Sequence, residues 1–363
     1  MIYDLSDTTT SAVNRKLVDL RENGSAIALG RVLTLIVVTE DGLVENAITA
    51  ANSASREHPC RVITLGRANR RGASRLDAQI RVGGDAGASE VIVLRLYGPL
   101  ADHGDSVIVP LLLPDAPIVV WWPGPPPEVP VQDPIGRMAQ RRITDSAAGR
   151  SPIRNLHQRA ASHAPGDTDL AWTRVTLWRA LLAASLDQPP YERVTRAVVN
   201  GSVDSPSTDL LAAWLALTLR CPVKRERSRT HQGLVGVELE RPSGSISLQR
   251  PNGSTAQLTQ PGQMTRRISL PPRADSDCLA EELRRLDPDD VFGEVITKGL
   301  ALLDQAVAAR SAKPAGTTME PAAAEADQGS AKVQRSAAVA GRRNDRSKSA
   351  TSPPAPETVP TAR

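Results

Sequence analysis

Aromatic residues are scarce in this chain of 363 residues, which has five Trp, three Tyr and one Phe. Its three cysteines, Cys60, Cys221 and Cys278, lie far apart, and none belongs to a Cys-x-x-Cys pair. Isolated cysteines in odd number argue against a disulfide-stapled secreted domain and fit a reducing compartment. No apolar run approaches the ~20 residues of a membrane-spanning helix, and Met1 to Asp7 is polar and acidic, unlike a signal peptide. We expect a cytoplasmic protein without a membrane partner.

An excess of one charge is also missing from most of the chain. Residues 1–309 contain 35 basic and 35 acidic residues, so the formal net charge of +4 arises entirely in residues 310–363. Only six of the 44 basic residues are Lys. A nucleic-acid-binding domain should show a basic stripe on a folded face, and we find none. Nucleic-acid binding through the tail is therefore the weakest of the functional hypotheses.

Motifs of catalysis and of cofactor binding are absent as well. The sequence has no GxxxxGK[ST] loop, no GxSxG elbow, and no GxGxxG after the first predicted strand. The glycine cluster Gly83–Gly87 joins two predicted strands and is typical of a hairpin loop. His58 and Cys60 lie two residues apart, but no third metal ligand is near, and a zinc site needs three or four. We expect no catalytic residues, no metal and no cofactor.

Hydrophobic patterning predicts an α/β (α+β) fold with two mixed-sheet units. We place an N-terminal α/β domain at 1–123, a Pro/Gly/Arg-rich connector at 124–151, a C-terminal α/β domain at 152–310 and a disordered tail at 311–363. Adjacent antiparallel hairpins argue against a pure Rossmann winding. The expected strands lie at 32–38, 60–66, 78–82, 90–97, 117–122, 193–199, 234–240, 244–250, 254–259 and 264–270. The expected helices lie at 43–57, 105–113, 153–161, 170–186, 210–219, 278–286 and 291–309.

Three segments carry more polar and aromatic chemistry than a scaffold requires. In Trp121-Trp122-Pro123-Gly124, neighbouring side chains of a strand point to opposite faces. One indole can therefore enter the core while the other faces outward or under the connector, the alternative being that both are buried. The segment from Pro165 to Arg179 combines a predicted helix cap with Trp beside Arg, a common interface pairing. A helix-to-strand turn contributes a third set. The candidate contact residues are Trp121, Trp122, Asp167, Asp169, Trp172, Arg174, Trp178, Arg179, His58 and Arg61.

Several long strings identify a family resemblance. SREHPCRVI, WWPG, DPIGRMAQRRITDS, PGDTDLAWTR, WRALLAASLDQPP and ELRRLDPDDVF occur here in the same order as in the OpcA family of actinobacterial type. The resemblance covers residues 1–309. It implies a non-catalytic protein that binds glucose-6-phosphate dehydrogenase, an NADPH-producing enzyme of the oxidative pentose phosphate pathway, and promotes its assembly or activity. It brings no catalytic residues with it, and with three isolated cysteines we expect no disulfide switch.

A second hypothesis is a sugar-phosphate-binding enzyme or sensor. Its donors would be the arginines of the connector, Arg137, Arg141 and Arg142, which we also count among the candidate contact residues. A ligand site should be a concave pocket with converging donors, whereas a protein interface is a broad patch.

Overall fold

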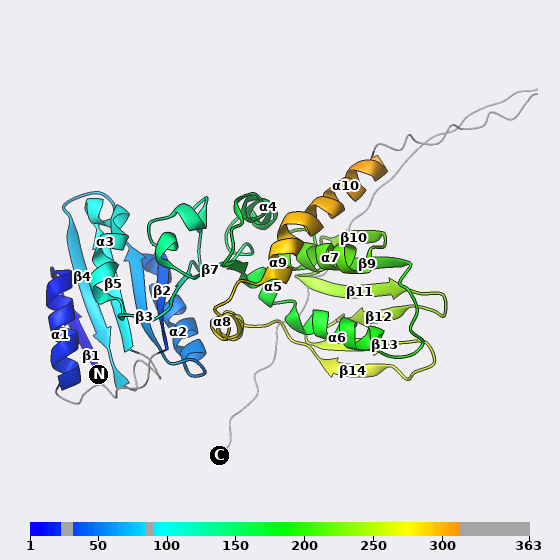
Figure 1. Ribbon diagram of the computed structural model, residues 1–363, viewed down its shortest axis with the longest axis horizontal. Coiled ribbons are helices and arrows are strands. Elements are labelled where there is room, and N and C mark those ends of the chain that lie inside the picture. Colours follow the sequence, from blue (N-terminus) through cyan, green and yellow to red (C-terminus); the bar gives the residue numbers. More distant parts are fainter. Residues whose placement is uncertain (23–31, 84–89, 312–363) are drawn as a thin grey trace, which may run out of the picture. The chain divides into compact units, whose positions relative to one another are not determined.

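The computed structural model describes residues 1–22, 32–83 and 90–311, which belong to one compact unit (Figure 1). The predicted disordered tail lies outside the described residues except for Ser311, and so does most of the predicted hairpin loop at 83–87. The described part is an α/β structure with two mixed sheets, as the sequence predicted. None of the helices within the described ranges is long and apolar enough to cross a membrane.

The first sheet has the strand order β1-β4-β5-β3-β2-β6-β7-β8. Its strands are β1 (Ile2–Leu5), β2 (Leu33–Glu40), β3 (Cys60–Arg67), β4 (Arg75–Arg81), β5 (Glu90–Tyr97), β6 (Ile118–Trp121), β7 (Arg141–Thr144) and β8 (Asp167–Asp169).

The parallel part of this sheet is doubly wound. Numbered along the chain, its parallel strands β2, β3, β5, β6, β7 and β8 follow the order 3-2-1-4-5-6, which is that of dinucleotide-binding folds. β4 pairs antiparallel with β5, and β1 pairs antiparallel with β4. The antiparallel hairpin that the sequence suggested is therefore an addition to one edge of a Rossmann-type sheet.

Both faces of the first sheet are covered, which explains the almost continuous apolar runs of its central strands. On one face Ile36 and Ile63 pack with Leu17 of α1 (Thr10–Glu22), near the short α3 (Gly104–Ile108). On the other face Leu35 packs with α2 (Val44–Ser55) and with α8 (Asp275–Leu283).

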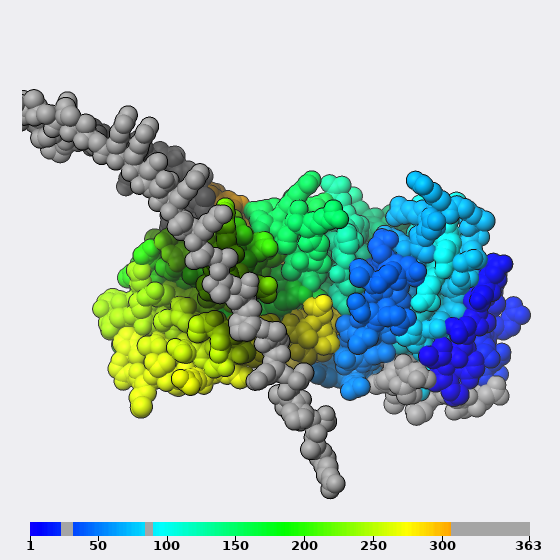
Figure 2. Space-filling view, turned by 180° about the vertical axis from the view of Figure 1, so that it is seen from behind, coloured from blue at the N-terminus to red at the C-terminus, as the bar shows by residue number. Residues whose placement is uncertain are grey.

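Helix α8 comes from the far end of the chain. Figure 2 shows its gold atoms beside the blue atoms of α2, and the two helices are in contact. Cys278, Leu279 and Leu283 of α8 are buried in the same cluster as Val44 and Ile48 of α2. The C-terminal part of the chain thus completes the core of the first sheet.

The second sheet has the order β10-β9-β11-β12-β13-β14. Only β9 and β10 are parallel. Apolar and polar residues alternate along these strands, and the apolar ones lie on one face of the sheet, where they pack against α7 (Pro206–Leu219). Its strands are β9 (Arg196–Ser202), β10 (Val223–Ser228), β11 (Leu234–Glu240), β12 (Ile246–Gln249), β13 (Thr255–Thr259) and β14 (Arg266–Ser269), and the remaining helices are α4 (Pro152–Ser162), α5 (Leu170–Thr173), α6 (Thr176–Leu186), α7 (Pro206–Leu219), α9 (Asp290–Glu294) and α10 (Leu300–Ser311).

Some boundaries differ from those expected. The first sheet extends past residue 123, because β7 from the predicted connector and β8 from beyond it pair parallel to β6 and to each other. These short polar strands, RRIT and DTD, have no apolar alternation to reveal them. The helix expected at 170–186 is two helices that break at Arg174–Val175. The last helix contains a π-helical turn, Val295–Gly299, where Gly299 lies close to the backbone of Ala213 in α7.

Candidate functional site

The three segments that the sequence singled out converge in part at one edge of the first sheet. The carboxyl ends of parallel strands lie on the same edge, and this is where open α/β sheets bind ligands. β6 ends there in Trp121, which Trp122 follows, β7 leads into Asp145, and β8 ends in Asp169. His58 and Arg61 are not part of this cluster, since they lie at the opposite, amino end of the parallel strand β3.

Asp169 is the centre of a hydrogen-bond network at this edge. It is fully buried, and its carboxylate accepts hydrogen bonds from Thr144 Oγ1 (2.7 Å), from the Ser146 backbone N–H (2.9 Å) and Oγ (2.7 Å), and from the Ala171 N–H (2.9 Å). The last bond makes Asp169 the N-cap of α5, as predicted. Burial raises the pKa of Asp169, against the effect of these hydrogen bonds. The network joins β7 to β8 and to α5.

Arg174 connects this edge to α8. Its guanidinium donates two hydrogen bonds to the carboxylate of Asp145, at 2.8 and 2.6 Å, and a third to Asp275 at 2.7 Å. Burial alone would lower the pKa of Arg174, but its hydrogen bonds to the two carboxylates, and their negative charges, outweigh burial and raise the pKa above its usual value. Arg174 thus joins the loop after β7 to the start of α8 through two ion pairs.

The tryptophans of the flagged segments are all in the core. Trp121, Trp122, Trp172 and Trp178 are each at most 2% exposed. The interpretation in which one indole of the Trp121–Trp122 pair faces outward is therefore wrong. The two side chains do point to opposite faces of the sheet, but helices cover both faces, so Trp122 lies in one apolar cluster and Trp121 in the other.

Most of the flagged arginines are also buried and paired. Arg61 contacts Glu90 at 2.8 Å and donates to the Leu111 carbonyl at 2.6 Å. Arg141 pairs with Glu282 and donates to the Asp287 carbonyl at 2.8 Å. Arg142 pairs with Asp167 and donates to the carbonyls of Ala139 and Pro165.

These contacts bear on the sugar-phosphate hypothesis. It required Arg137, Arg141 and Arg142 to converge on a ligand, and only Arg137 is exposed. The hypothesis is wrong for Arg141 and Arg142, because their buried guanidiniums take acceptors from the protein itself.

Two other candidates remain partly accessible. His58 is half-buried at the turn before β3. Arg179 lies with its guanidinium 3.6 Å from the centre of the Trp172 ring and donates to Thr176 Oγ1 at 3.1 Å. Its pKa is lowered by burial. Leu177 of α6, which was not among the candidate contact residues, is 45% exposed.

The turn after β2 occupies the position where a dinucleotide-binding fold places its glycine-rich phosphate loop. Here the sequence is Glu40-Asp41-Gly42-Leu43, and Asp41 accepts a hydrogen bond from Arg95 Nε at 3.0 Å. A carboxylate at this point repels a pyrophosphate. This fold therefore has the strand order of a dinucleotide-binding protein without its phosphate-binding turn.

Metal-ligating side chains are not gathered anywhere in the described ranges. No group of three or more His, Cys, Asp and Glu residues with the arrangement of a metal site occurs within residues 1–22, 32–83 and 90–311.

Comparison with protein families matches both halves of the chain to domains of one family. Residues 51–161 match the N-terminal domain, and residues 165–296 the C-terminal domain, of the family described as a glucose-6-phosphate dehydrogenase subunit, OpcA. The chain belongs to the OpcA family. The resemblance seen in the sequence strings is thereby confirmed. No curated relative matches this OpcA chain.

Solved structures with low sequence identity resemble the OpcA chain. An oxidoreductase from Sinorhizobium meliloti has a TM-score of 0.44 at 11% identity, covering 77% of this chain and 98% of its own. A glucose-6-phosphate dehydrogenase in complex with its substrate has a TM-score of 0.39 at 8% identity, covering 77% and 92%. A glucose-6-phosphate 1-dehydrogenase from Mycobacterium avium has a TM-score of 0.36 at 11% identity, covering 79% and 93%.

Proposed function

We propose that this OpcA-family chain is a non-catalytic cytoplasmic protein that binds glucose-6-phosphate dehydrogenase and promotes its assembly or activation in the oxidative pentose phosphate pathway. The observation that carries the proposal is the family match, which spans 51–161 in the first half and 165–296 in the second. Both matched segments are described as domains of a glucose-6-phosphate dehydrogenase subunit.

The chemistry of the carboxyl edge supports binding rather than catalysis. A general acid or base needs a proton-transfer group that can reach a substrate. Asp169 instead directs its oxygens at Thr144, Ser146 and Ala171, and Asp145 is held by Arg174. The acidic turn at Asp41 disfavours a dinucleotide cofactor. These groups hold the loops in place.

A contact surface is available on α6, within the segment that the sequence singled out. Leu177, Ala180 and Ala184 follow helical spacing and are all exposed. Arg179 lies beside them over Trp172. Arg is enriched at protein interfaces, and the exposed apolar strip beside it offers a surface that a partner can cover. We propose this strip as a contact with the dehydrogenase.

Under this proposal the buried members of the candidate set have a supporting role. Trp172 and Trp178 anchor α5 and α6 in the core of the second sheet. Asp167 and Asp169 position the start of α5 through Arg142 and the cap. Their substitution would alter the contact surface through the fold.

A pull-down of purified glucose-6-phosphate dehydrogenase with the full chain tests the proposal. We expect a complex on size-exclusion chromatography with light scattering, and a dehydrogenase rate that rises and saturates as the chain is added. The mass of the complex separates assembly of the enzyme from activation of an already assembled enzyme. If the dehydrogenase neither binds nor changes its rate, the proposal fails.

A further inference from the structure

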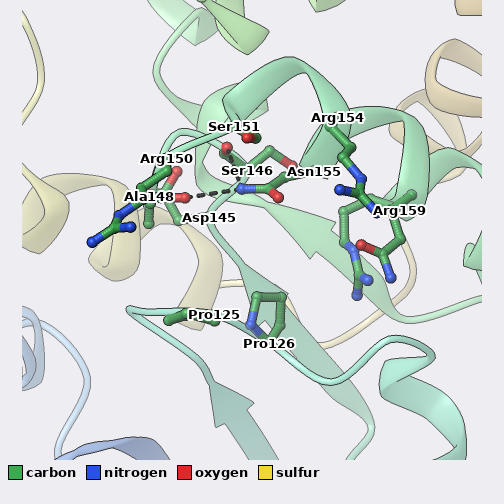
Figure 3. Close-up of a pocket in the computed structure, with 12 residues that line it drawn as sticks. Pro125, Pro126, Asp145, Ser146, Ala148, Arg150, Ser151, Arg154, Asn155 and Arg159 are labelled. Carbon is green, nitrogen blue, oxygen red and sulfur yellow. Dashed lines mark hydrogen bonds between the residues drawn. The ribbon is translucent and has the colours of Figure 1, made fainter.

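A cavity of about 310 Å³ lies beyond the carboxyl ends of β6 and β7. Figure 3 shows Arg154 and Arg159 extending from α4 on one side, with Pro125 and Pro126 opposite them. Arg150 lies on the rim, on the loop after β7. The volume of the cavity is at the lower end of the range for small-molecule sites, ~300–1,000 Å³.

The arginines of this cavity have no carboxylate partners among the residues that the structure describes. Arg159 is only 6% exposed, and its guanidinium donates to the backbone carbonyls of Pro127 (2.9 Å) and Glu128 (2.7 Å). Burial lowers the pKa of Arg159. Arg154 and Arg150 are exposed and make no ion pair within the described ranges. A buried cation without a counter-ion gains strongly from a bound anion.

The carboxylate and one hydroxyl of the lining are already engaged. Asp145 is the one carboxylate that lines this cavity within the described residues, and Arg174 neutralises it with two hydrogen bonds. Ser146 Oγ donates to Asp169. Among the charged groups of the lining, three guanidiniums without an ion pair in the described residues outnumber the one carboxylate, which is paired, so the net charge of the lining is positive.

Helix α4 adds to this positive field. It has 11 residues and begins at the cavity, and its N-cap residue Ser151 does not use its side chain to cap the helix. Uncapped N–H groups and the helix dipole favour anions at a helix N-terminus.

A second cavity that is also lined by arginines has a different charge pairing. It measures about 360 Å³ and is lined by Arg174, Arg250 and Arg273, among others. Arg174 is paired with Asp145 and Asp275, and Arg273 is paired with Glu281. Two of its three cations are thus neutralised, whereas those of the first cavity are not.

We propose that the cavity between α4 and the loops after β6 and β7 binds a phosphate group, either as inorganic phosphate or on a small metabolite. Arg154 and Arg159 are its principal donors, and the N-terminus of α4 lies beside them. The cavity is concave and small, while the charges of residues 1–309 balance overall, so the site suits a compact anion rather than an extended polyanion. The proposal does not depend on binding to the dehydrogenase.

Isothermal titration calorimetry of the full chain tests this inference, with inorganic phosphate and glucose 6-phosphate as separate ligands, glucose as the uncharged control and ionic strength held constant. We expect saturable binding of at least one phosphate ligand and none of glucose. Tighter binding of glucose 6-phosphate identifies a metabolite site, and equal or tighter binding of inorganic phosphate identifies a site for the free ion.

The variant Arg154→Gln should weaken the phosphate ligand roughly tenfold or more, since it removes a charge-assisted hydrogen-bond donor. It should leave the fold intact, because Arg154 is exposed and unpaired within the described residues. The matched control is Arg267→Gln, an exposed arginine of β14 outside this cavity, which should bind like the parent chain. The inference is overturned if neither phosphate ligand binds up to about 10 mM, or if Arg154→Gln binds as tightly as Arg267→Gln.

Discussion

Arg174 and Asp145 form a two-pronged ion pair, with N–O distances of 2.8 and 2.6 Å, between the helix break after α5 and the loop after β7. Asp145 is buried, and Arg174 reaches a second carboxylate, Asp275 of α8, at 2.7 Å. The guanidinium of Arg174 thereby connects the carboxyl edge of the first sheet to α8, the helix that packs beside α2 on one face of that sheet.

Replacement of Arg174 by Ala should destabilise the fold. It leaves the buried Asp145 without a counter-ion, a change that costs ~3–5 kcal/mol for a fully buried pair. Because Arg174 is itself 21% exposed, we expect about 2–3 kcal/mol. Urea denaturation measures this loss. Arg179→Ala is the comparison, since Arg179 has an aromatic contact and no ion pair in the described residues, and should cost about 1 kcal/mol. Equal losses would show that the ion pair contributes nothing.

Replacement of Leu177 by Asp should weaken binding to glucose-6-phosphate dehydrogenase without unfolding the chain. Leu177 is 45% exposed on α6, so its polar substitution should change stability by no more than about 0.5 kcal/mol. The matched control is Leu302→Asp on α10, because Leu302 is 43% exposed. Titration of the dehydrogenase rate against each variant compares the two. Full activation by Leu177→Asp would exclude the proposed α6 contact.

Replacement of Trp172 tests the scaffold below α6. The indole N–H donates to Asp289 at 2.9 Å, and the side chain is 1% exposed. Trp172→Ala should cost ~3–5 kcal/mol, as for other large buried aromatics. Trp172→Phe keeps most of the packing and loses the hydrogen bond to Asp289, so it should cost ~1–3 kcal/mol. Denaturation followed by circular dichroism measures both. A loss below about 1 kcal/mol for Trp172→Ala would contradict its place in the core.

Cys278 should make stability depend on alkaline pH. Burial raises the pKa of its thiol to about 12, from an ordinary value near 9. The unfolded thiol ionises first, so the contribution of Cys278 is complete below about pH 9 and is lost as pH rises toward about 12, by ~1.4 kcal/mol per pH unit. We expect Cys278→Ala to lose less stability than the parent chain between pH 8 and pH 10. Parallel pH profiles would contradict this expectation.

Removal of the tail after Arg310 should change neither stability nor activation. Residues 311–363 lie outside the segments that match the family, and they contain no aromatic residue. Thermal unfolding and the dehydrogenase titration, each compared with the full chain, measure the two properties. A large decrease in either would assign a function to the tail.

Local sequence patterns predicted many of the elements near the site. The apolar run after Val32 became β2, and the segment from Glu90 to Tyr97 became β5 at the predicted bounds. Asp169 caps a helix as its position before Leu170 indicated. These features depend on residues within one turn or one strand of each other, so the sequence displays them directly.

The sequence did not show in the same way which arginines are buried in ion pairs and which are exposed at a cavity. Arg141 and Arg154 are both basic residues in a Pro/Gly/Arg-rich stretch or next to it. The structure buries Arg141 against Glu282, 141 residues away, and leaves Arg154 unpaired, among the described residues, at a cavity. No local pattern distinguishes a buried structural arginine from one that is free to bind an anion, because the difference is a distant carboxylate.

By itself the sequence determined the α/β class, the lack of catalytic and metal-binding motifs and the OpcA family, since these follow from hydrophobic periodicity, residue spacing and long ordered strings. Only the tertiary structure decided the strand order of the first sheet, the burial of both indoles at Trp121 and Trp122, and the insertion of α8 into the core of a sheet formed more than a hundred residues earlier. Those features depend on contacts between segments far apart along the chain, and the free energy of such contacts is set by the completed packing rather than by either segment alone.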